Sequence, residues 1–366
     1  MGGAPQKTIG RILRGATLHV RREEWALFAL MGFCALVVLS SRTGFDPVVP
    51  FKGYWNFFAR RILLLFVVTR IVFYLADRWQ PTGRWPTRLR DFLFAPPERR
   101  APTEKVDLEI VRGTLLLFIS LAIYSNVKAR ISYINPTVGD SFFAELDRTL
   151  FGSGFITAIE AWFRGDTDVV EFFAGIYMHG YFWMMVLVFL LYMRRDQFAM
   201  RWTIMAVCFT YLIAILLTVA HPSYGPFAVE PERWRWLAGS EVGITQNWLT
   251  AMRDHNAIML AAGYRVEAVA FAGIAAFPSL HVGHMFVMLV VALRTFKLYA
   301  VWMLGVASLT FIATIGFGWH YAVDAVGGAA LAAGITHLTY VLMRRWDAQR
   351  GVPPAAPEAK PIDPSA

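Results

Sequence analysis

The sequence has few charged residues and almost no cysteine. Asp, Glu, Lys and Arg together make up 17% of its 366 residues, whereas 57% are hydrophobic, and the mean hydropathy is +0.46. This balance excludes an ordinary water-soluble globular domain. The two cysteines, Cys34 and Cys208, stand far apart inside apolar runs, so the sequence supports neither a disulfide framework nor a cysteine-based metal site.

Acidic residues are too few to balance the basic ones, and the formal net charge is +9. A nucleic-acid-binding protein would carry such a charge on one face of a soluble fold. Here the cations fall between apolar runs instead, which is the distribution that orients membrane proteins. We therefore expect the membrane bilayer as a partner, and no nucleic acid.

Eight apolar stretches have about the length that crosses a bilayer. They lie near residues 25–41, 57–77, 108–126, 172–193, 203–220, 281–293, 298–317 and 321–343. The sequence therefore predicts an all-α integral membrane protein with about eight transmembrane helices.

The basic residues between these stretches alternate from one side to the other. They cluster in the N-terminal segment, the 78–111 loop, the turns near Arg194 and Arg294, and the C-terminal end. Since short cytoplasmic loops are rich in Lys and Arg, both termini are predicted to be cytoplasmic. The remaining segments are then extracytoplasmic: 127–171, 221–280 and 318–321.

A Pro- and Arg-rich segment divides the chain after the second apolar run. Four parts are predicted: an N-terminal segment with two extra transmembrane helices (1–77), a cytoplasmic linker (78–107), a six-helix core (108–345) and a disordered tail (346–366).

Two short polar segments, 277–284 and 318–324, flank the last three apolar runs. The interval between His281 and His320 accommodates one helical hairpin, so both histidines are predicted at the same extracytoplasmic membrane surface. His320 and Asp324 are four residues apart, and they share one face if a helix begins near His320.

This trio suits phosphoryl transfer without a metal or another cofactor. The Asp324 carboxylate would orient the His320 imidazole and stabilise its charged form, which leaves the other ring nitrogen free to attack phosphorus. His281 would protonate the departing alkoxide and later deprotonate the accepting hydroxyl. Pro278 and Ser279 mark a helix start, whose free backbone N–H groups form an anion site.

Two alternatives to a metal-free catalytic trio stay open. A single membrane histidine, such as His179 or His337, is more often a packed, hydrogen-bonded residue than a catalyst. The trio differs because a carboxylate near the membrane is costly and needs a specific partner. The second alternative is a zinc site. Its ligands would be His281, His284, His320 and Asp324.

Two motifs resemble those of the type 2 phosphatidic acid phosphatase superfamily, namely Pro278-Ser279-Leu280-His281 and His320-Tyr321-x-x-Asp324-x-x-x-Gly328. They are most similar to its inositolphosphotransferase branch, the aureobasidin-resistance or inositol phosphorylceramide synthase relatives. The resemblance covers approximately residues 108–345. It implies a six-helix core in which His320 is the nucleophile, Asp324 orients it, and His281 is the acid and base.

Departures from the phosphatase motifs favour a transferase. Leu280 stands where the phosphatases usually have glycine, and Ala313-Thr314 stand where they have a Ser-Arg pair. Other cations must then face the phosphate. Lys128 and Arg130 are the candidates, since they follow the third helix on the side where positive charge is disfavoured. Interfacial snorkelling is the alternative for both.

The leading hypothesis is an enzyme that moves a phosphoryl-linked headgroup from a phospholipid or lipid-phosphate donor to a lipid alcohol. The resemblance implies inositol phosphate as the headgroup, with ceramide as one acceptor. Asp140 or Asp147 would contact the headgroup or cap a helix. The alternative is a lipid phosphate or polyprenyl diphosphate phosphatase. A non-catalytic transporter or scaffold would instead hold its polar residues near the membrane midplane. The sequence leaves the oligomeric state open.

Overall fold

The computed structural model describes residues 20–41, 43–79, 102–266, 268 and 273–351. Every regular element among these residues is a helix, which confirms the predicted all-α class. In chain order the helices are α2 (Arg22–Ser40), α3 (Val48–Trp79), α5 (Thr103–Lys128), α6 (Ile131–Ile134), α7 (Asp140–Phe163), α8 (Thr167–Met178), α9 (Gly180–Arg194), α10 (Gln197–Ala220), α11 (Pro226–Val229), the 3-10 helix η3 (Pro231–Leu237), α12 (Glu241–Ala261), α13 (Leu280–Thr295), α14 (Lys297–Gly316) and α15 (Ala322–Gln349).

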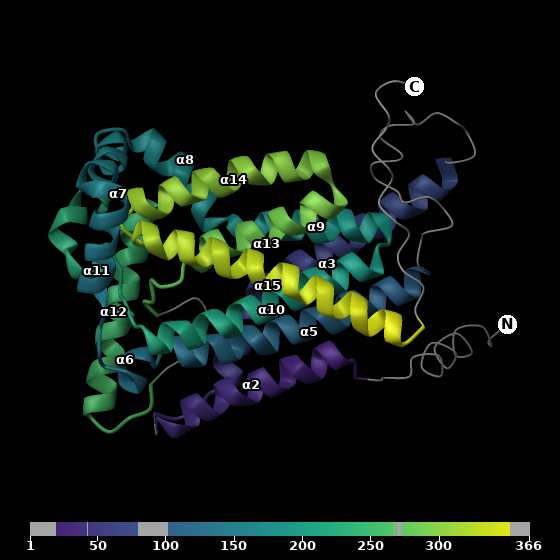
Figure 1. The fold of residues 1–366 in the computed structure, drawn as a ribbon, viewed down its shortest axis with the longest axis horizontal. Coiled ribbons are helices and arrows are strands. Elements are labelled where there is room, and N and C mark those ends of the chain that lie inside the picture. Colours follow the sequence, from purple (N-terminus) through teal and green to yellow (C-terminus); the bar gives the residue numbers. More distant parts are fainter. Residues whose placement is uncertain (1–19, 42, 80–101, 267, 269–272, 352–366) are drawn as a thin grey trace.

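The long helices lie side by side along the long axis of the molecule (Figure 1). α10 and α15 both pack on α13, and α5 packs on α10. The helices α7, α11 and α12 gather at one end of this bundle and run across it (Figure 1). We call this the histidine end, because α13 and α15 begin there beside His281 and His320. The opposite end, where α2 begins and α15 ends, is the basic end.

Each predicted apolar run coincides with a helix to within one residue, although the run 172–193 is divided between α8 and α9. Among the described residues, four helices are long and apolar enough to cross a bilayer: α2, α10, α14 and α15. α8 and α9, bent by 47°, give a fifth if they form one span. The chain is therefore a multi-pass membrane protein. The count of eight stays a prediction, since α13, for example, has only 16 residues.

The two histidines for which the sequence favours a packed, hydrogen-bonded role make local contacts. His179 lies at the bend between α8 and α9, where its Nδ1 is 3.0 Å from the Gly175 carbonyl oxygen. His337 lies on α15, with its Nδ1 3.2 Å from an Arg294 guanidinium nitrogen. These bonds give each histidine a structural role at its own position.

One continuous hydrophobic core joins the N-terminal helices to the rest of the bundle. α2 buries Cys34 against its neighbours, and Cys208 is buried on α10; both are free thiols. α3 buries Tyr54, whose hydroxyl lies 2.8 Å from Ser125 Oγ of α5. α15 continues to Gln349, beyond the predicted core boundary. Most of the predicted linker and tail lies outside the described residues.

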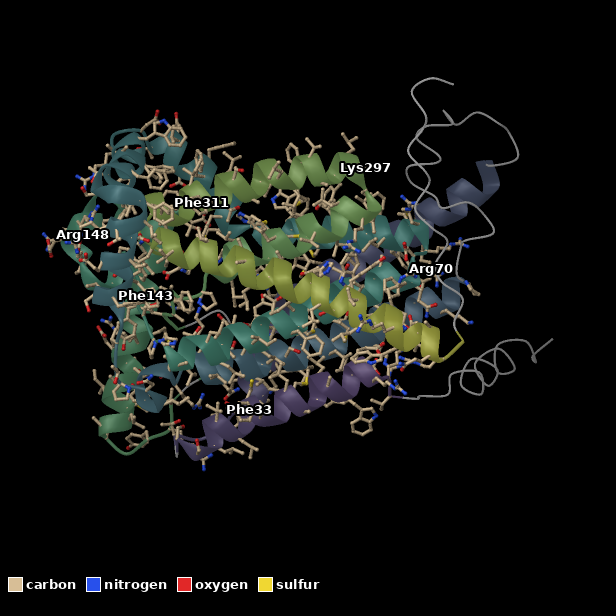
Figure 2. The ribbon with its side chains drawn as sticks, in the orientation of Figure 1. Phe33, Arg70, Phe143, Arg148, Lys297 and Phe311 are labelled. Carbon is tan, nitrogen blue, oxygen red and sulfur yellow. The ribbon has the colours of Figure 1, made fainter. Side chains whose placement is uncertain are left out.

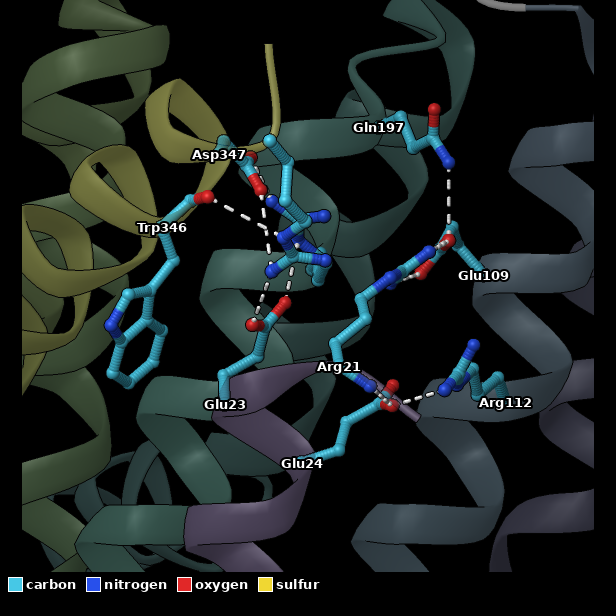
Figure 3. Close-up of polar contacts among 10 residues, drawn as sticks. Arg21, Glu23, Glu24, Glu109, Arg112, Gln197, Trp346 and Asp347 are labelled. Atoms are coloured by element: carbon cyan, nitrogen blue, oxygen red, sulfur yellow. Dashed lines mark hydrogen bonds and ion pairs between the residues drawn. The ribbon is translucent and has the colours of Figure 1, made fainter. Parts of the chain in front are cut away.

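A network of ion pairs joins α2, α5, α10 and α15 at the basic end (Figure 3). Glu23, which is 1% exposed, accepts a hydrogen bond from Arg350 at 3.1 Å and lies 3.5 Å from Arg201. Asp347 pairs with the same Arg201. The adjoining contacts are Glu24 with Arg112, and Glu109 with Arg21 and Gln197. Because α2 begins here, the network fixes the start of that helix to its neighbours.

We expect Glu23→Ala to lower the melting temperature of the purified protein in detergent, because it removes the buried carboxylate that Arg201 and Arg350 share and leaves them to Asp347. Breaking such a buried pair costs about 3 kcal/mol. The control is Glu232→Ala: Glu232 and its partner Arg235 are 71% and 76% exposed, and an exposed pair contributes little. Equal melting temperatures for the two variants would contradict a stabilising role for the network.

Candidate active site

The structure brings His281 and His320 together, with their ring centroids 6.4 Å apart. His281 lies in the first turn of α13, and His320 directly precedes Tyr321, the N-cap residue of α15. The Ser279 backbone N–H donates to the Asp324 carbonyl oxygen at 2.9 Å. This bond joins the start of α13 to the first turn of α15, so the backbone itself fixes the position of His281 relative to His320.

Two acceptors lie beside Nδ1 of His320. The Ala276 carbonyl oxygen is 2.7 Å away, and Asp324 Oδ2 is 3.7 Å away. Since a carbonyl oxygen only accepts, Nδ1 carries the proton and Nε2 keeps its lone pair. The carbonyl thus makes the tautomer-fixing bond that the sequence led us to expect from Asp324. The carboxylate still lies close enough to stabilise a charged imidazolium.

Asp324 is fully buried. Its Oδ2 accepts a hydrogen bond from the Tyr321 N–H at 2.9 Å, which helps to cap α15. Its Oδ1 has no hydrogen-bond partner among the described residues. A buried carboxylate without full compensation is costly, so Asp324 is placed to stabilise a positive charge that forms on the neighbouring His320 ring during a reaction.

His281 contacts a residue that the sequence did not reveal. The Tyr177 hydroxyl lies 3.0 Å from His281 Nδ1, and the two rings stack with their centroids 4.1 Å apart. When the Tyr177 oxygen accepts from the Nδ1–H, Nε2 is the ring nitrogen that can give a proton as a general acid and take one back as a base. Tyr177 lies on α8, 104 residues before His281, and no local pattern marks it.

A cavity of about 410 Å³ opens beside both histidines, and we call it the apolar cavity. Its walls are mainly aromatic side chains, most of them from α3, α5, α8, α10 and α12, together with aliphatic residues of the segment 274–280. Among the described lining residues, Lys128 is the one lysine or arginine. Lys128 is the last residue of α5, and its ammonium group lies 5.8 Å from the centroid of the Tyr124 ring.

Two other predicted binding residues lie outside the lining of this cavity. Arg130 is 1% exposed, and its guanidinium donates to the carbonyl oxygens of Asn126 at 2.9 Å and Val266 at 2.8 Å. The Ser279 hydroxyl is buried and has no hydrogen-bond partner among the described residues. Arg130 thus holds backbone segments together, whereas Ser279 acts through its backbone at the start of α13.

Two aspartates of α7 bind backbone N–H groups. Asp140 accepts from residues 224–225 at 2.9 Å each, and from the Tyr321 hydroxyl at 3.1 Å. Asp147 accepts from residues 322–323 at 2.7 and 2.8 Å. Burial raises the pKa of the Asp147 carboxyl, and the two N–H donors oppose that rise. Of the two roles open for Asp147, the geometry gives it that of a cap for α15.

No three His, Cys, Asp or Glu side chains converge to hold a metal ion within the part of the chain that the structure describes. His284, one of the candidate zinc ligands, packs instead against Tyr211, with the ring centroids 4.3 Å apart.

The arrangement is therefore a two-histidine site with a buried carboxylate, at one end of a membrane-spanning helical bundle. Residues 141–338 match the PAP2 superfamily. Since this is more than half of the chain, the chain belongs to that superfamily, and it is an enzyme of the phosphatase or phosphotransferase type. The match confirms the superfamily predicted from the two motifs, while the inositolphosphotransferase branch stays a prediction. No curated protein and no solved structure matches the chain.

The glycine that ends the second motif lies where two backbones approach closely. A Cβ atom on Gly328 would overlap the Ser279 carbonyl oxygen. On the facing helix, a Cβ atom on Gly283 would lie 3.2 Å from the Gly328 carbonyl oxygen. These two glycines let α13 and α15 pack closely, as small residues do between membrane helices, and so set the separation of the two histidines.

We expect Gly328→Ala to remove most of the activity, although it changes no reacting group. The added methyl pushes the start of α13 away from α15, and a displacement of about 1 Å in an active site costs roughly 100-fold in rate. The measurement is turnover of a lipid phosphate in detergent micelles.

The matched control is Gly334→Ala on the same helix, where the new Cβ would have no neighbour within 4 Å. It should keep its activity and melt no lower, because alanine is the better helix former by about 1 kcal/mol. Similar activity in both variants would show that the close contact does not position the site.

Proposed function

We propose that this PAP2 enzyme is a lipid phosphotransferase. It forms a phosphohistidine at Nε2 of His320 and passes the phosphoryl-linked headgroup to the hydroxyl of a second lipid. One observation carries the proposal: Nδ1 of His320 is hydrogen-bonded to a carbonyl oxygen, and the His320 ring lies beside His281 and the apolar cavity. With Nδ1 protonated, Nε2 is the atom available to attack phosphorus.

In the first half-reaction, Nε2 of His320 bonds to phosphorus while the bond from phosphorus to the lipid oxygen breaks. His281 enters this step as the imidazolium; it gives its Nε2 proton to that oxygen and becomes neutral, so the lipid leaves as a neutral alcohol. The phosphorylated His320 ring is now positively charged. Asp324, with Oδ2 3.7 Å from Nδ1, stabilises this charge, and the Ala276 carbonyl keeps its hydrogen bond.

In the second half-reaction, the acceptor hydroxyl gives its proton to His281, which is now a neutral base. The acceptor oxygen bonds to phosphorus as the bond to His320 breaks. The product is a new phosphate ester of the acceptor lipid, and both histidines return to their starting protonation states. The same residue thus serves as acid in one step and as base in the other.

Lys128 and the start of α13 stabilise the phosphate charge in this proposal. The N–H groups of Leu280 and His281 belong to the first helical turn, which has no acceptors within the helix. Ser279 and Arg130 act indirectly, by fixing the start of α13 and the segment around Val266. Asp140 acts in the same way on the turn at residues 224–225.

Two features support a transferase over the alternative, a lipid phosphate or polyprenyl diphosphate phosphatase. The cavity beside His320 has room for part of a second lipid, and the phosphatase Ser-Arg pair is replaced by Ala313-Thr314. By resemblance, the donor is phosphatidylinositol and the acceptor a lipid alcohol such as ceramide. The alternation of basic loops supports an extracytoplasmic position for the histidine end.

We expect His320→Ala to lower turnover by about 10³-fold or more, since units of this kind lose several powers of ten when a member is removed. Asp324→Asn should also lower turnover severely, but by a smaller factor than His320→Ala, because the Ala276 carbonyl still fixes the tautomer of His320. In His281→Ala the phosphohistidine should accumulate and be trapped as acid-labile labelled protein. His337→Ala is the control and should keep the turnover of the wild-type enzyme. Near-normal turnover by His320→Ala would refute the mechanism.

We also expect product formation to depend on a lipid alcohol. Purified enzyme is given phosphatidylinositol with and without ceramide or diacylglycerol, in the presence of a chelator, while inositol phosphate and new phospholipid are followed by mass spectrometry. A transferase forms the new phospholipid and little free inositol phosphate, because the acceptor hydroxyl rather than water resolves the phosphohistidine. Rapid release of phosphate from lipid phosphates without an acceptor would establish the phosphatase instead.

A further inference from the structure

The proposed mechanism needs a positive charge on His281, because the imidazolium is the form that gives a proton to the departing lipid oxygen. The groups around His281 oppose that charge. Among the described residues, the titratable side chains that act on it are His320, Lys128 and His284, and none of these is a carboxylate that could balance the charge. A nearby cation disfavours a second one. The imidazolium of His281 therefore needs another source of stabilisation.

Tyr177 makes two contacts with His281 that stabilise a cation. Its hydroxyl oxygen lies 3.0 Å from Nδ1 and accepts from the Nδ1–H of the imidazolium, and such a hydrogen bond is stronger when its donor is charged. Its ring stacks on the imidazole, with 4.1 Å between the centroids and 21° between the planes. The face of an aromatic ring attracts a cation. Both contacts are therefore stronger with the imidazolium than with the neutral ring.

Trp319 extends this aromatic stack. Its indole is parallel to the Tyr177 ring, with 6° between the planes and 6.0 Å between the centroids, and Phe227 packs against the indole at 4.9 Å. Tyr177 and Trp319 are 2% and 7% exposed, so packing fixes both rings. Trp319 directly precedes His320, whereas Tyr177 comes from the last turn of α8. The stack thus joins α8, the start of α13 and the turn before α15, and it holds His281 at a fixed position beside His320.

We propose that Tyr177, supported by Trp319, is a positioning residue for His281: it holds the imidazole in place and stabilises its protonated form. The effect is largest for a lipid donor, because the alkoxide of a lipid alcohol is a poor leaving group and needs a proton. Neither residue lies in the two motifs, 278–281 and 320–328. The inference rests on the proposed phosphohistidine mechanism and adds the residues that make His281 an effective acid.

The test compares donors that differ in how much proton assistance they need. Phosphatidylinositol and phosphatidic acid release an alcohol, whereas p-nitrophenyl inositol phosphate and p-nitrophenyl phosphate carry the same phosphate groups and release nitrophenolate, which leaves without a proton. For each variant we compare kcat/KM for the lipid with kcat/KM for its nitrophenyl counterpart. Tyr177→Phe, which removes the oxygen and keeps the ring, should lower this ratio roughly tenfold. Tyr177→Leu removes both contacts and should lower the ratio further, whereas Trp319→Leu acts only through Tyr177 and should lower it less.

The dependence on pH gives a second readout. His281 acts as an acid only while it is protonated, so kcat/KM for the lipid falls on the alkaline side as His281 loses its proton. Without Tyr177 that proton is lost at a lower pH, so the fall should begin at a lower pH in Tyr177→Phe and at a still lower pH in Tyr177→Leu. The titration of His281 is also followed directly by NMR of enzyme with isotope-labelled histidine, with His281→Gln to assign the signal. It should shift in the same direction.

Tyr299→Phe is the matched control. Tyr299 is 7% exposed, and its hydroxyl donates to the Trp183 carbonyl oxygen at 2.6 Å. It follows Lys297 closely, at the end of α14 that is remote from the histidine end (Figure 2). The variant therefore loses a buried hydrogen bond far from His281. It should lower the melting temperature but keep the substrate ratio and the pH dependence of the wild-type enzyme.

The outcomes separate the two proposals. An equal change of the ratio in Tyr299→Phe, or an unchanged titration of His281 in Tyr177→Leu, would overturn the positioning role and leave the phosphohistidine mechanism intact. Because the titration needs no substrate, it decides the positioning role even if neither lipid is turned over. Near-normal lipid turnover by His320→Ala contradicts the mechanism itself.

Discussion

The geometry of the site depends on the close contact between α13 and α15. Gly283 and Gly328 have no side chains that would hold these helices apart. The Ser279 N–H donates a hydrogen bond to the Asp324 carbonyl oxygen between them. In lipid, helix association depends on such close packing rather than on the hydrophobic effect. Because both histidines lie at the starts of these helices, the same contact that stabilises the bundle also sets the distance between His281 and His320, the acid and the nucleophile of the proposed mechanism.

The sequence predicted those parts of the fold and site that depend on local patterns. Apolar runs gave the helices, and the hairpin interval placed His281 near His320. It did not predict the Ala276 carbonyl as the partner of His320 Nδ1, nor Tyr177 as the partner of His281. Both partners come from segments outside the motifs, and a backbone carbonyl leaves no signature in residue type. Such contacts follow from tertiary packing.

The N-terminal helices show the same limit at the level of domains. The Pro- and Arg-rich segment suggested that residues 1–77 form an extension separate from the core. In the structure α3 packs on α5, and Tyr54 and Phe57 of α3 line the apolar cavity beside the two histidines. A helix in a bilayer buries its surface on whichever neighbour complements it, so a loop between helices does not mark a boundary between sites. The wall of the apolar cavity is therefore shared by both predicted parts.

The charges near the site bear on the kind of phosphate that fits it. Asp147 already binds the N–H groups of residues 322–323, so the start of α15 has few donors left for an anion. The groups that remain to bind a phosphate are the Lys128 ammonium and the backbone N–H groups of the first turn of α13. A phosphomonoester carries about −1.5 to −2 charges near neutral pH, whereas a diester carries one. An unbalanced charge in an apolar cavity is costly, and a single lysine balances a diester. In the proposed mechanism, Lys128 and the start of α13 would therefore balance the single charge of a phosphodiester more fully than the charge of a monoester.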